Sequence, residues 1–206
     1  MAVSFDLFDT LVSVDTPEDP AAAVAAELRD RGVSVPSDFG DAYREVHIDA
    51  PAGAEVPLPA HVAAALSSRG VDAPNNAPRR AVVAAFDPEV ERRRGALTAI
   101  DAAAERGPVA LCSNCSVPEL VARTLYRGGL RGSFDAIVTS VGCGWRKPDA
   151  RMFEHVGTQL GVEPGSIVHV GDDPETDGGI EAVGGEFVNV AETPLSDLPA
   201  ALESVP

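Results

Sequence analysis

Lysine is nearly absent from this sequence. Fifteen of the 16 basic residues among the 206 are arginine, and Lys147 is the one exception. Arginine carries a broad planar guanidinium that keeps its proton, whereas lysine ends in a compact ammonium on a slim stem. A single lysine in such a chain indicates a position that arginine cannot fill. We therefore interpret Lys147 as a buried partner for a small anion.

Cysteine and long apolar runs are also scarce. Three cysteines are too few for a disulfide scaffold, which is typical of a reducing cytoplasm. No run approaches the roughly 20 apolar residues of a membrane span, and the first apolar stretch contains Asp6 and Asp9, unlike a signal peptide. We expect a cytoplasmic protein without a membrane partner. Cys112 and Cys115 have the spacing of a zinc half-site, but with Cys143 as the only other thiol we interpret them as small buried side chains.

Positive charge is in short supply overall. Acidic residues outnumber basic ones by 32 to 16, which gives a formal net charge of −16. A field of that sign repels nucleic acid and anionic membranes, so neither is an expected partner. The charges are dispersed along the chain, which favours a solvated surface over an acidic tail. The composition resembles that of proteins from salt-loving archaea, and we expect a monomer or a homodimer.

The pattern of apolar segments divides the chain into two kinds of region. Short apolar runs alternate with helical segments after Asp87, which predicts an α/β fold with a parallel sheet. The expected strands are residues 2–5, 108–112, 134–140, 166–171 and 186–190, and the expected helices between them are 89–106, 117–127 and 149–160. Residues 15–87 contain only helical candidates, at 17–31, 37–48, 58–69 and 77–86. We therefore predict a core of residues 1–14 and 88–206 with a helical insertion at 15–87.

Polar side chains follow the expected strands at the points where they end. Because parallel strands direct their carboxyl ends to one edge, where ligands bind in open α/β sheets, these side chains should share one rim. The candidates are Asp6, Ser113, Asn114, Lys147, Asp172, Asp173 and Asp177. A carboxylate, a hydroxyl, an ammonium and an acidic cluster would then face one ligand.

Four segments resemble the four motifs of the haloacid dehalogenase-like (HAD) hydrolases, in the order and spacing of that family. They are Phe5-Asp-Leu-Phe-Asp-Thr-Leu11, Leu111-Cys-Ser-Asn114, Lys147-Pro-Asp-Ala-Arg-Met-Phe153 and Val170-Gly-Asp-Asp-Pro-Glu-Thr-Asp177. The resemblance implies a Rossmann-like core, and the 15–87 insertion falls where one branch of the family carries a helical cap. It also implies a hydrolase that acts on a small phosphorylated substrate.

The same resemblance implies a role for each motif residue. Asp6 would be the nucleophile that forms an aspartyl-phosphate, which splits one difficult displacement into two easier ones. Lys147 would neutralise Asp6 and the substrate. Ser113, with Asn114 beside it, would hydrogen-bond the transferring group where charge develops. Thr10 would orient the nucleophile's loop.

A magnesium site is implied as well. Mg²⁺ binds one or two carboxylates together with water and phosphate oxygens. The resemblance assigns as ligands Asp6, the backbone carbonyl of Phe8, and Asp172, with Asp173 and Asp177 acting through water or holding Lys147. Several carboxylates facing one ammonium and an anionic substrate need such a divalent ion to balance their charge.

One position departs from the phosphatases of this family. They usually carry a second aspartate two positions after the nucleophile, which protonates the leaving alcohol, and here that position is Phe8. General acid–base catalysis contributes about 10²–10⁴-fold. Asp9 follows, but on a strand-like exit it would point to another side unless the loop is unusually twisted. The rate of hydrolysis would fall least for acyl, enol and aryl phosphates, because their leaving groups need no proton.

Three functions therefore remain open. The first is a Mg²⁺-dependent phosphatase. The second is a metal-free 2-haloacid dehalogenase, since that branch has an aromatic residue at the position of Phe8; it would need an arginine of the insertion, for which Arg29, Arg31 and Arg44 are available. The third is a weak or inactive relative that binds a ligand or a protein partner.

Overall fold

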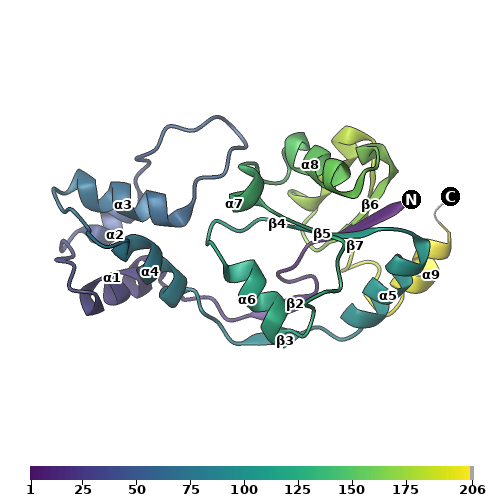
Figure 1. Ribbon diagram of the computed structural model, residues 1–206, viewed down its shortest axis with the longest axis horizontal. Coiled ribbons are helices and arrows are strands. Elements are labelled where there is room, and N and C mark those ends of the chain that lie inside the picture. The colour runs from purple at the N-terminus through teal and green to yellow at the C-terminus, as the bar shows by residue number, and fades with distance from the viewer. Residues whose placement is uncertain (205–206) are drawn as a thin grey trace.

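The computed structural model describes residues 1–204, and Figure 1 shows a sheet-containing lobe beside a smaller helical lobe. The main sheet has five parallel strands in the order β5-β4-β1-β6-β7. They are β1 (Ala2–Phe5), β4 (Val109–Ser113), β5 (Ala136–Thr139), β6 (Ile167–Gly171) and β7 (Glu186–Asn189). The expected α/β fold is confirmed. The chain builds outward from β1 first on one side and then on the other, so the strand order reverses beside β1, where such sheets bind ligands.

Helices cover both faces of this sheet. Because side chains alternate along a strand, Val3 and Phe5 join one core cluster, while Ala2 joins a second cluster on the other face. Helices α5 (Ala96–Arg106) and α9 (Leu198–Glu203) pack together on the first side. On the second side lie α8 (Ala150–Leu160) and the 3₁₀ segment η2 (Asp177–Val183). The remaining elements of this lobe are α6 (Leu120–Arg127), α7 (Ser140–Cys143) and η1 (Pro164–Ser166).

The helical lobe consists of four helices that fall within the predicted insertion. They are α1 (Pro20–Asp30), α2 (Phe39–Arg44), α3 (Leu58–Ser68) and α4 (Ala77–Ala85). Helix α4 packs against α1 and α3, and α2 packs against α3. The sequence starts α1 with an N-cap, since the Asp19 carboxylate accepts the amide of Ala22 and Pro20 occupies the first turn. Within residues 15–87 of this structure there is no strand, as the sequence predicted.

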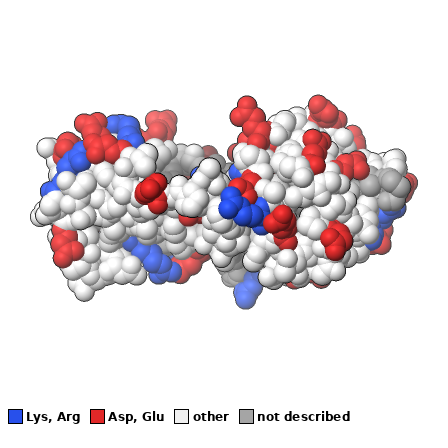
Figure 2. All heavy atoms as spheres, turned by 90° about the horizontal axis from the view of Figure 1, so that it is seen from above, with Lys and Arg blue, Asp and Glu red and all other residues white. Residues whose placement is uncertain are grey.

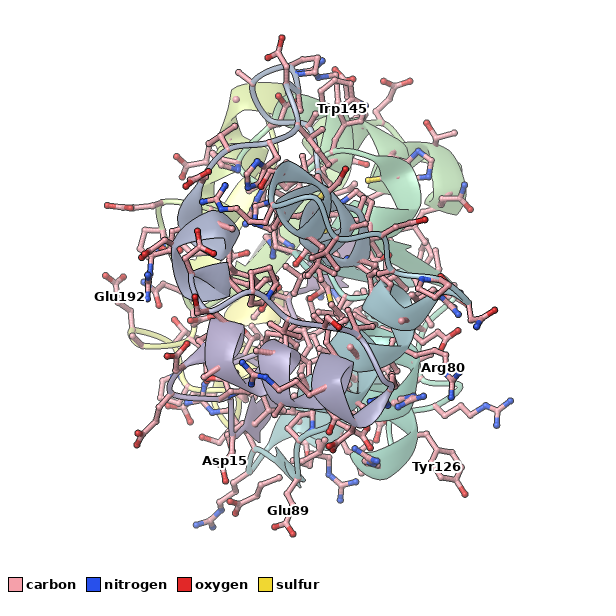
Figure 3. The ribbon with its side chains drawn as sticks, turned by 90° about the vertical axis from the view of Figure 1, so that its left-hand side faces the viewer. Asp15, Arg80, Glu89, Tyr126, Trp145 and Glu192 are labelled. Atoms are coloured by element: carbon pink, nitrogen blue, oxygen red, sulfur yellow. The ribbon has the colours of Figure 1, made fainter. Side chains whose placement is uncertain are left out.

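Two linkers join the lobes, and they pair as a small antiparallel sheet. Strand β2 (Val12–Val14) pairs with β3 (Val90–Arg92), with Val14 opposite Val90. Figure 3 looks at the molecule from the helical lobe and shows Asp15 and Glu89 of these linkers close together at its lower edge. The predicted helix at 89–106 was therefore wrong in its first part: residues 90–92 find strand partners at least 76 positions away, and the helix begins only at Ala96.

A long loop makes a second connection between the lobes. In Figure 1 it runs from α2 to α3 and arches over towards α7. Residues 51–58 of this loop, here called the strap, bind the sheet lobe through backbone hydrogen bonds: Arg146 N to Gly53 O at 3.0 Å, Glu55 N to Gly144 O at 2.9 Å and Leu58 N to Ser116 O at 2.9 Å. The predicted helix at 37–48 ends already at Arg44 because the chain turns here towards the sheet lobe.

The surface agrees with the charge count. Figure 2 shows acidic side chains spread over both lobes of the face in view, with no acidic patch that dominates it. Of the helices in residues 1–204, none has the length and apolar character that a membrane crossing requires.

Candidate active site

Lys147 lies buried between two carboxylates at the carboxyl end of the sheet. Its Nζ is 2.7 Å from Asp6 Oδ1 and 2.5 Å from Asp177 Oδ1. The residue is only 2% exposed, and Asp6 and Asp177 are 8% and 1% exposed. Asp6 directly follows β1, and Asp177 opens η2 after β6, so neighbouring strands deliver both acids to one ammonium. The sequence interpretation of Lys147 as a buried ion-pair partner matches this geometry.

Burial and pairing act on these groups in opposite directions. Burial raises the pKa of Asp6 to about 6, although the ammonium of Lys147 pulls the same pKa down. Burial also disfavours the charge on Asp177, but its hydrogen bonds to His169 and Lys147 outweigh that effect and hold the pKa of Asp177 well below its usual range. For Lys147, burial lowers the pKa and the adjacent acids raise it, with a net rise. Asp6 and Asp177 together therefore favour the charged form of Lys147, and Asp177 itself favours the carboxylate form.

Asp177 belongs to a buried hydrogen-bonded chain that continues through His169 to Ser4. His169 Nε2 is 3.0 Å from Asp177 Oδ1, and His169 Nδ1 is 2.8 Å from the hydroxyl of Ser4. Burial lowers the pKa of His169, so the neutral ring donates one hydrogen bond to the carboxylate. The backbone amide of Asp173 donates to Asp177 Oδ2 at 3.1 Å. Both oxygens of Asp177 are thus engaged by protein groups.

The remaining acidic candidates separate in the structure. Asp172 Oδ1 accepts the hydroxyl of Thr10 at 2.9 Å, which ties the loop after β6 to the loop after β1. Asp173 instead accepts from the amide of Glu175 and the hydroxyl of Thr176, so its carboxylate caps its own turn. Within residues 1–204, no group of three or more His, Cys, Asp or Glu side chains is arranged to hold a metal ion.

Ser113 and Asn114 occupy the end of β4. The Ser113 hydroxyl is buried and, among the described residues, has no hydrogen-bond partner. The Asn114 amide donates to the carbonyl of Lys147 at 3.0 Å and its oxygen accepts the amide of Lys147 at 2.8 Å. Asn114 thereby fixes the backbone of Lys147, whereas the hydroxyl of Ser113 makes no such contact.

The loop that follows Asp6 is twisted at Asp9. Asp9 has φ of 58°, in the left-handed region that non-glycine residues seldom adopt, and its carbonyl accepts from the guanidinium of Arg93. Phe8 and Asp9 line one pocket of about 280 Å³, which Asn114 and Arg146 also line. The unusual loop that the sequence analysis required for Asp9 is therefore present, and Phe8 faces the same pocket.

The sequence analysis missed the strap, because backbone hydrogen bonds leave no residue signature. Its residue Ala54 forms an antiparallel bridge with Trp145, two positions before Lys147. The guanidinium of Arg151 stacks over the Trp145 ring, with its central carbon 3.2 Å from the ring centroid. Figure 3 shows Trp145 at the upper edge, on the side opposite to the linkers. The helical lobe is thus attached to the sheet lobe on two sides.

Sequence comparison identifies relatives that share part of this chain. A family model described as haloacid dehalogenase-like hydrolase matches residues 1–184. Haloacid dehalogenase-like hydrolase domain-containing protein 3 of Bos taurus is 41% identical over 80 residues, which are 38% of this chain and 31% of that protein. The aligned region thus spans about a third of the relative's length.

Solved structures share the fold over nearly the whole chain. The 2-haloacid dehalogenase from Pseudomonas syringae pv. Tomato DC3000 superposes with a TM-score of 0.67 at 19% identity and covers 98% of this chain and 97% of that chain. The HAD phosphatase from Thermococcus onnurineus has a TM-score of 0.58 at 21% identity, covering 91% of this chain and 85% of that chain. At such identities the likeness concerns the fold alone. The family model, which matches most of the chain, shows that this protein belongs to the haloacid dehalogenase-like hydrolases.

Proposed function

We propose that the protein is a Mg²⁺-dependent phosphatase that acts on a small phosphorylated metabolite through an aspartyl-phosphate at Asp6. The observation that carries this proposal is the buried Lys147–Asp6 ion pair, 2.7 Å long, at the same sheet edge as the unpaired hydroxyl of Ser113. A nucleophilic carboxylate, a fixed cation and a free hydrogen-bond donor are the groups that phosphoryl transfer needs around one phosphorus atom.

The acidic residues suit a magnesium ion when only two of them are counted as ligands. Asp6 and Asp172 follow the adjacent strands β1 and β6, and one oxygen of each remains outside the contacts described above. Mg²⁺ commonly takes one or two carboxylates and completes its shell with water and phosphate oxygens. Asp6, Asp172 and the carbonyl of Phe8 would hold it, and it would neutralise charge on the transferring phosphoryl group. Asp177 is better assigned to positioning Lys147, and Asp173 to capping its turn.

In the first step, an oxygen of Asp6 attacks phosphorus and forms the aspartyl-phosphate, while the bond to the leaving-group oxygen breaks and that oxygen departs with the electron pair. Lys147 compensates negative charge on Asp6 and on the phosphoryl oxygens, and Ser113 donates a hydrogen bond to one of those oxygens. In the second step, water attacks phosphorus and Asp6 leaves as a free carboxylate. Water must enter only after the first leaving group has departed.

The helical lobe is proposed to be the cap domain, comprising residues 15–87, that covers this site and excludes water. Both linkers and the strap reach the sheet lobe next to the candidate active-site loops. Lids of this kind commonly gate access to active sites.

Dehalogenation is the alternative, and Phe8 is the residue that favours it. That chemistry requires an arginine for the substrate carboxylate and the halide. Arg31 and Arg44 are instead ion-paired with Glu27 and Asp41 within the helical lobe, and Arg29 is not among the residues that line the pocket at Phe8. None of the three arginines lines that pocket, which favours the phosphatase.

The deciding experiment measures phosphate release from a panel of phosphorylated metabolites, in molar KCl to screen the net charge of −16, with either Mg²⁺ or EDTA. A parallel assay follows halide release from a 2-haloacid. Mg²⁺-dependent phosphate release that is absent in Asp6→Asn supports the proposal. Halide release without metal overturns it, and a folded protein that is inactive in both assays indicates a binding role.

A further inference from the structure

A pocket of about 280 Å³ lies where the two linkers meet the active-site loops. The first linker contributes Val14 to Pro17 and the second contributes Phe86 and Pro88. The nucleophile loop contributes Phe8 and Asp9, and the loop after β4 contributes Asn114 to Val117. The pocket therefore borders both the sheet lobe and the two linkers that lead to the helical lobe.

The pocket is next to the proposed reaction centre. Asn114 lines it and binds the backbone of Lys147 through two hydrogen bonds of 3.0 and 2.8 Å. Phe8, two residues beyond Asp6, also lines it. A leaving group attached to a phosphoryl group at Asp6 and Lys147 would extend into this space.

The walls of the pocket are mainly apolar. Two phenyl rings, Phe8 and Phe86, line it together with aliphatic side chains, namely those of Val14, Pro17, Pro88, Val117 and Leu120. An apolar cavity of about 150 Å³ is enough to bind benzene, so this pocket can take one substituted aromatic ring. The polar side chains that line it include those of Asp9 and Arg146, both of which are exposed to solvent.

Taken together with the proposed phosphatase activity, on which this inference rests, the geometry points to a specific class of substrate. We propose that the pocket receives an apolar aromatic leaving group, so that the preferred substrates are aryl phosphates. The ring would pack between Phe8 and Phe86, and its phenolic oxygen would leave as the phenolate.

The chemistry of the leaving group explains why a phenylalanine is acceptable at position 8. When the phosphorus–oxygen bond breaks, the electron pair goes to the leaving oxygen. An alkoxide is too basic to leave without a proton, and phosphatases therefore provide an acid. A phenolate is far more stable and takes its proton from water afterwards. Phe8 thus gives up acid catalysis and gains an apolar contact with the ring.

The first test compares kcat/KM for substituted phenyl phosphates with that for a simple alkyl phosphate. We expect the wild-type protein to prefer 4-nitrophenyl phosphate over the alkyl ester by more than 10²-fold, about the lower bound of an acid's contribution. Phe8→Asp should raise kcat/KM for the alkyl phosphate by about 10²-fold and change that for 4-nitrophenyl phosphate much less. Phe8→Leu, which supplies no acid, is the matched control and should not rescue the alkyl substrate.

The second test addresses the pocket itself. Phe86→Ala should raise KM for 4-nitrophenyl phosphate by about tenfold, because a large apolar contact is lost, and should leave KM for acetyl phosphate unchanged. Val83→Ala, in helix α4 three residues before Phe86 and outside the lining of this pocket, controls for a general loosening of the lobe.

The outcomes separate this inference from the proposed function. If wild-type protein hydrolyses alkyl and aryl phosphates equally well, the aryl preference is refuted while the phosphatase stands. Loss of alkyl turnover in Asp9→Asn would likewise refute it, because Asp9 would then be the acid. If no phosphate ester is hydrolysed with Mg²⁺ present, the phosphatase proposal itself fails.

Discussion

The Nζ of Lys147 lies 2.5 Å from Asp177 Oδ1, closer than its 2.7 Å distance to Asp6 Oδ1. Asp177, at 1% exposure, also accepts a hydrogen bond from His169, whereas Asp6 is 8% exposed. Asp177 therefore fixes the position of the Lys147 ammonium, and the same ammonium also contacts Asp6. Under the proposed mechanism, this arrangement would let Asp6 react while Asp177 holds Lys147 in place.

Lys147→Arg should abolish turnover and preserve the fold. The side chain at this position is 1% exposed and meets two carboxylates at one nitrogen, and a planar guanidinium spreads its donors over a wider fork. We expect kcat to fall by about 10²-fold or more, comparable to the loss of one preorganised donor, with the circular dichroism spectrum unchanged. A variant that keeps most of its activity would refute the interpretation of the lone lysine.

Asp172→Asn should weaken Mg²⁺ binding, and Asp173→Asn should not. Asp172 is tied to Thr10 at the site, whereas the carboxylate of Asp173 accepts from Glu175 and Thr176 within its own turn. We expect the apparent Kd for Mg²⁺ to rise by at least about tenfold in the first variant, measured by calorimetry and by activation of turnover. Equal effects in the two variants would contradict the assignment of ligands made here.

The stability of the metal-free protein should depend on His169 at mildly acidic pH. Burial lowers the pKa of His169 below its ordinary value of 6.5, so between the two pKa values the unfolded chain binds a proton that the folded chain does not. The contribution of His169 to the free energy of unfolding is therefore complete above pH 6.5. It is lost as the pH falls below that value, by at most about 1.4 kcal/mol per pH unit.

His169→Gln isolates this contribution, since glutamine cannot titrate but can still donate to Asp177. Asp6 acts in the opposite direction, because its raised pKa of about 6 lets the folded protein bind a proton between pH 6 and the ordinary 3.8. Urea unfolding at a series of pH values should show a smaller loss of stability towards acid in the variant than in the wild type. Identical pH profiles would show that folding does not lower the pKa of His169.

Gly53→Ala should destabilise the protein more than Gly70→Ala. Both glycines have a positive φ, 79° and 72°, so an alanine strains the backbone at either site by about 1–3 kcal/mol. At Gly53 a Cβ would also overlap the carboxylate of Asp149, which caps helix α8, whereas at Gly70 it would meet open space. Thermal unfolding measures the difference between the two variants. A strap that is unimportant for attachment would give equal shifts in Tm.

Local sequence patterns were sufficient for most elements of the fold. Helices at Pro20, Leu58 and Ala77 begin within a few residues of the predicted starts because proline and capping residues act on the adjacent turn. The errors concern segments whose partners are distant in sequence. Strand β3 was predicted as helix because its pairing with β2 is not visible in residues 90–92 themselves. The attachment of the strap could not be predicted for the same reason, since its hydrogen-bond partners are also distant in sequence.

The sequence by itself determined the family, the alternation of strands and helices, and the set of groups that meet at one sheet edge. These follow from motif spacing and from the fact that parallel strands end on the same side. Only the tertiary structure decided which partner each acidic side chain binds. Asp177 pairs with Lys147 and His169, Asp172 with Thr10, and Asp173 with its own turn. Such choices depend on burial and on distances of a few ångströms, and residue order does not specify either of them.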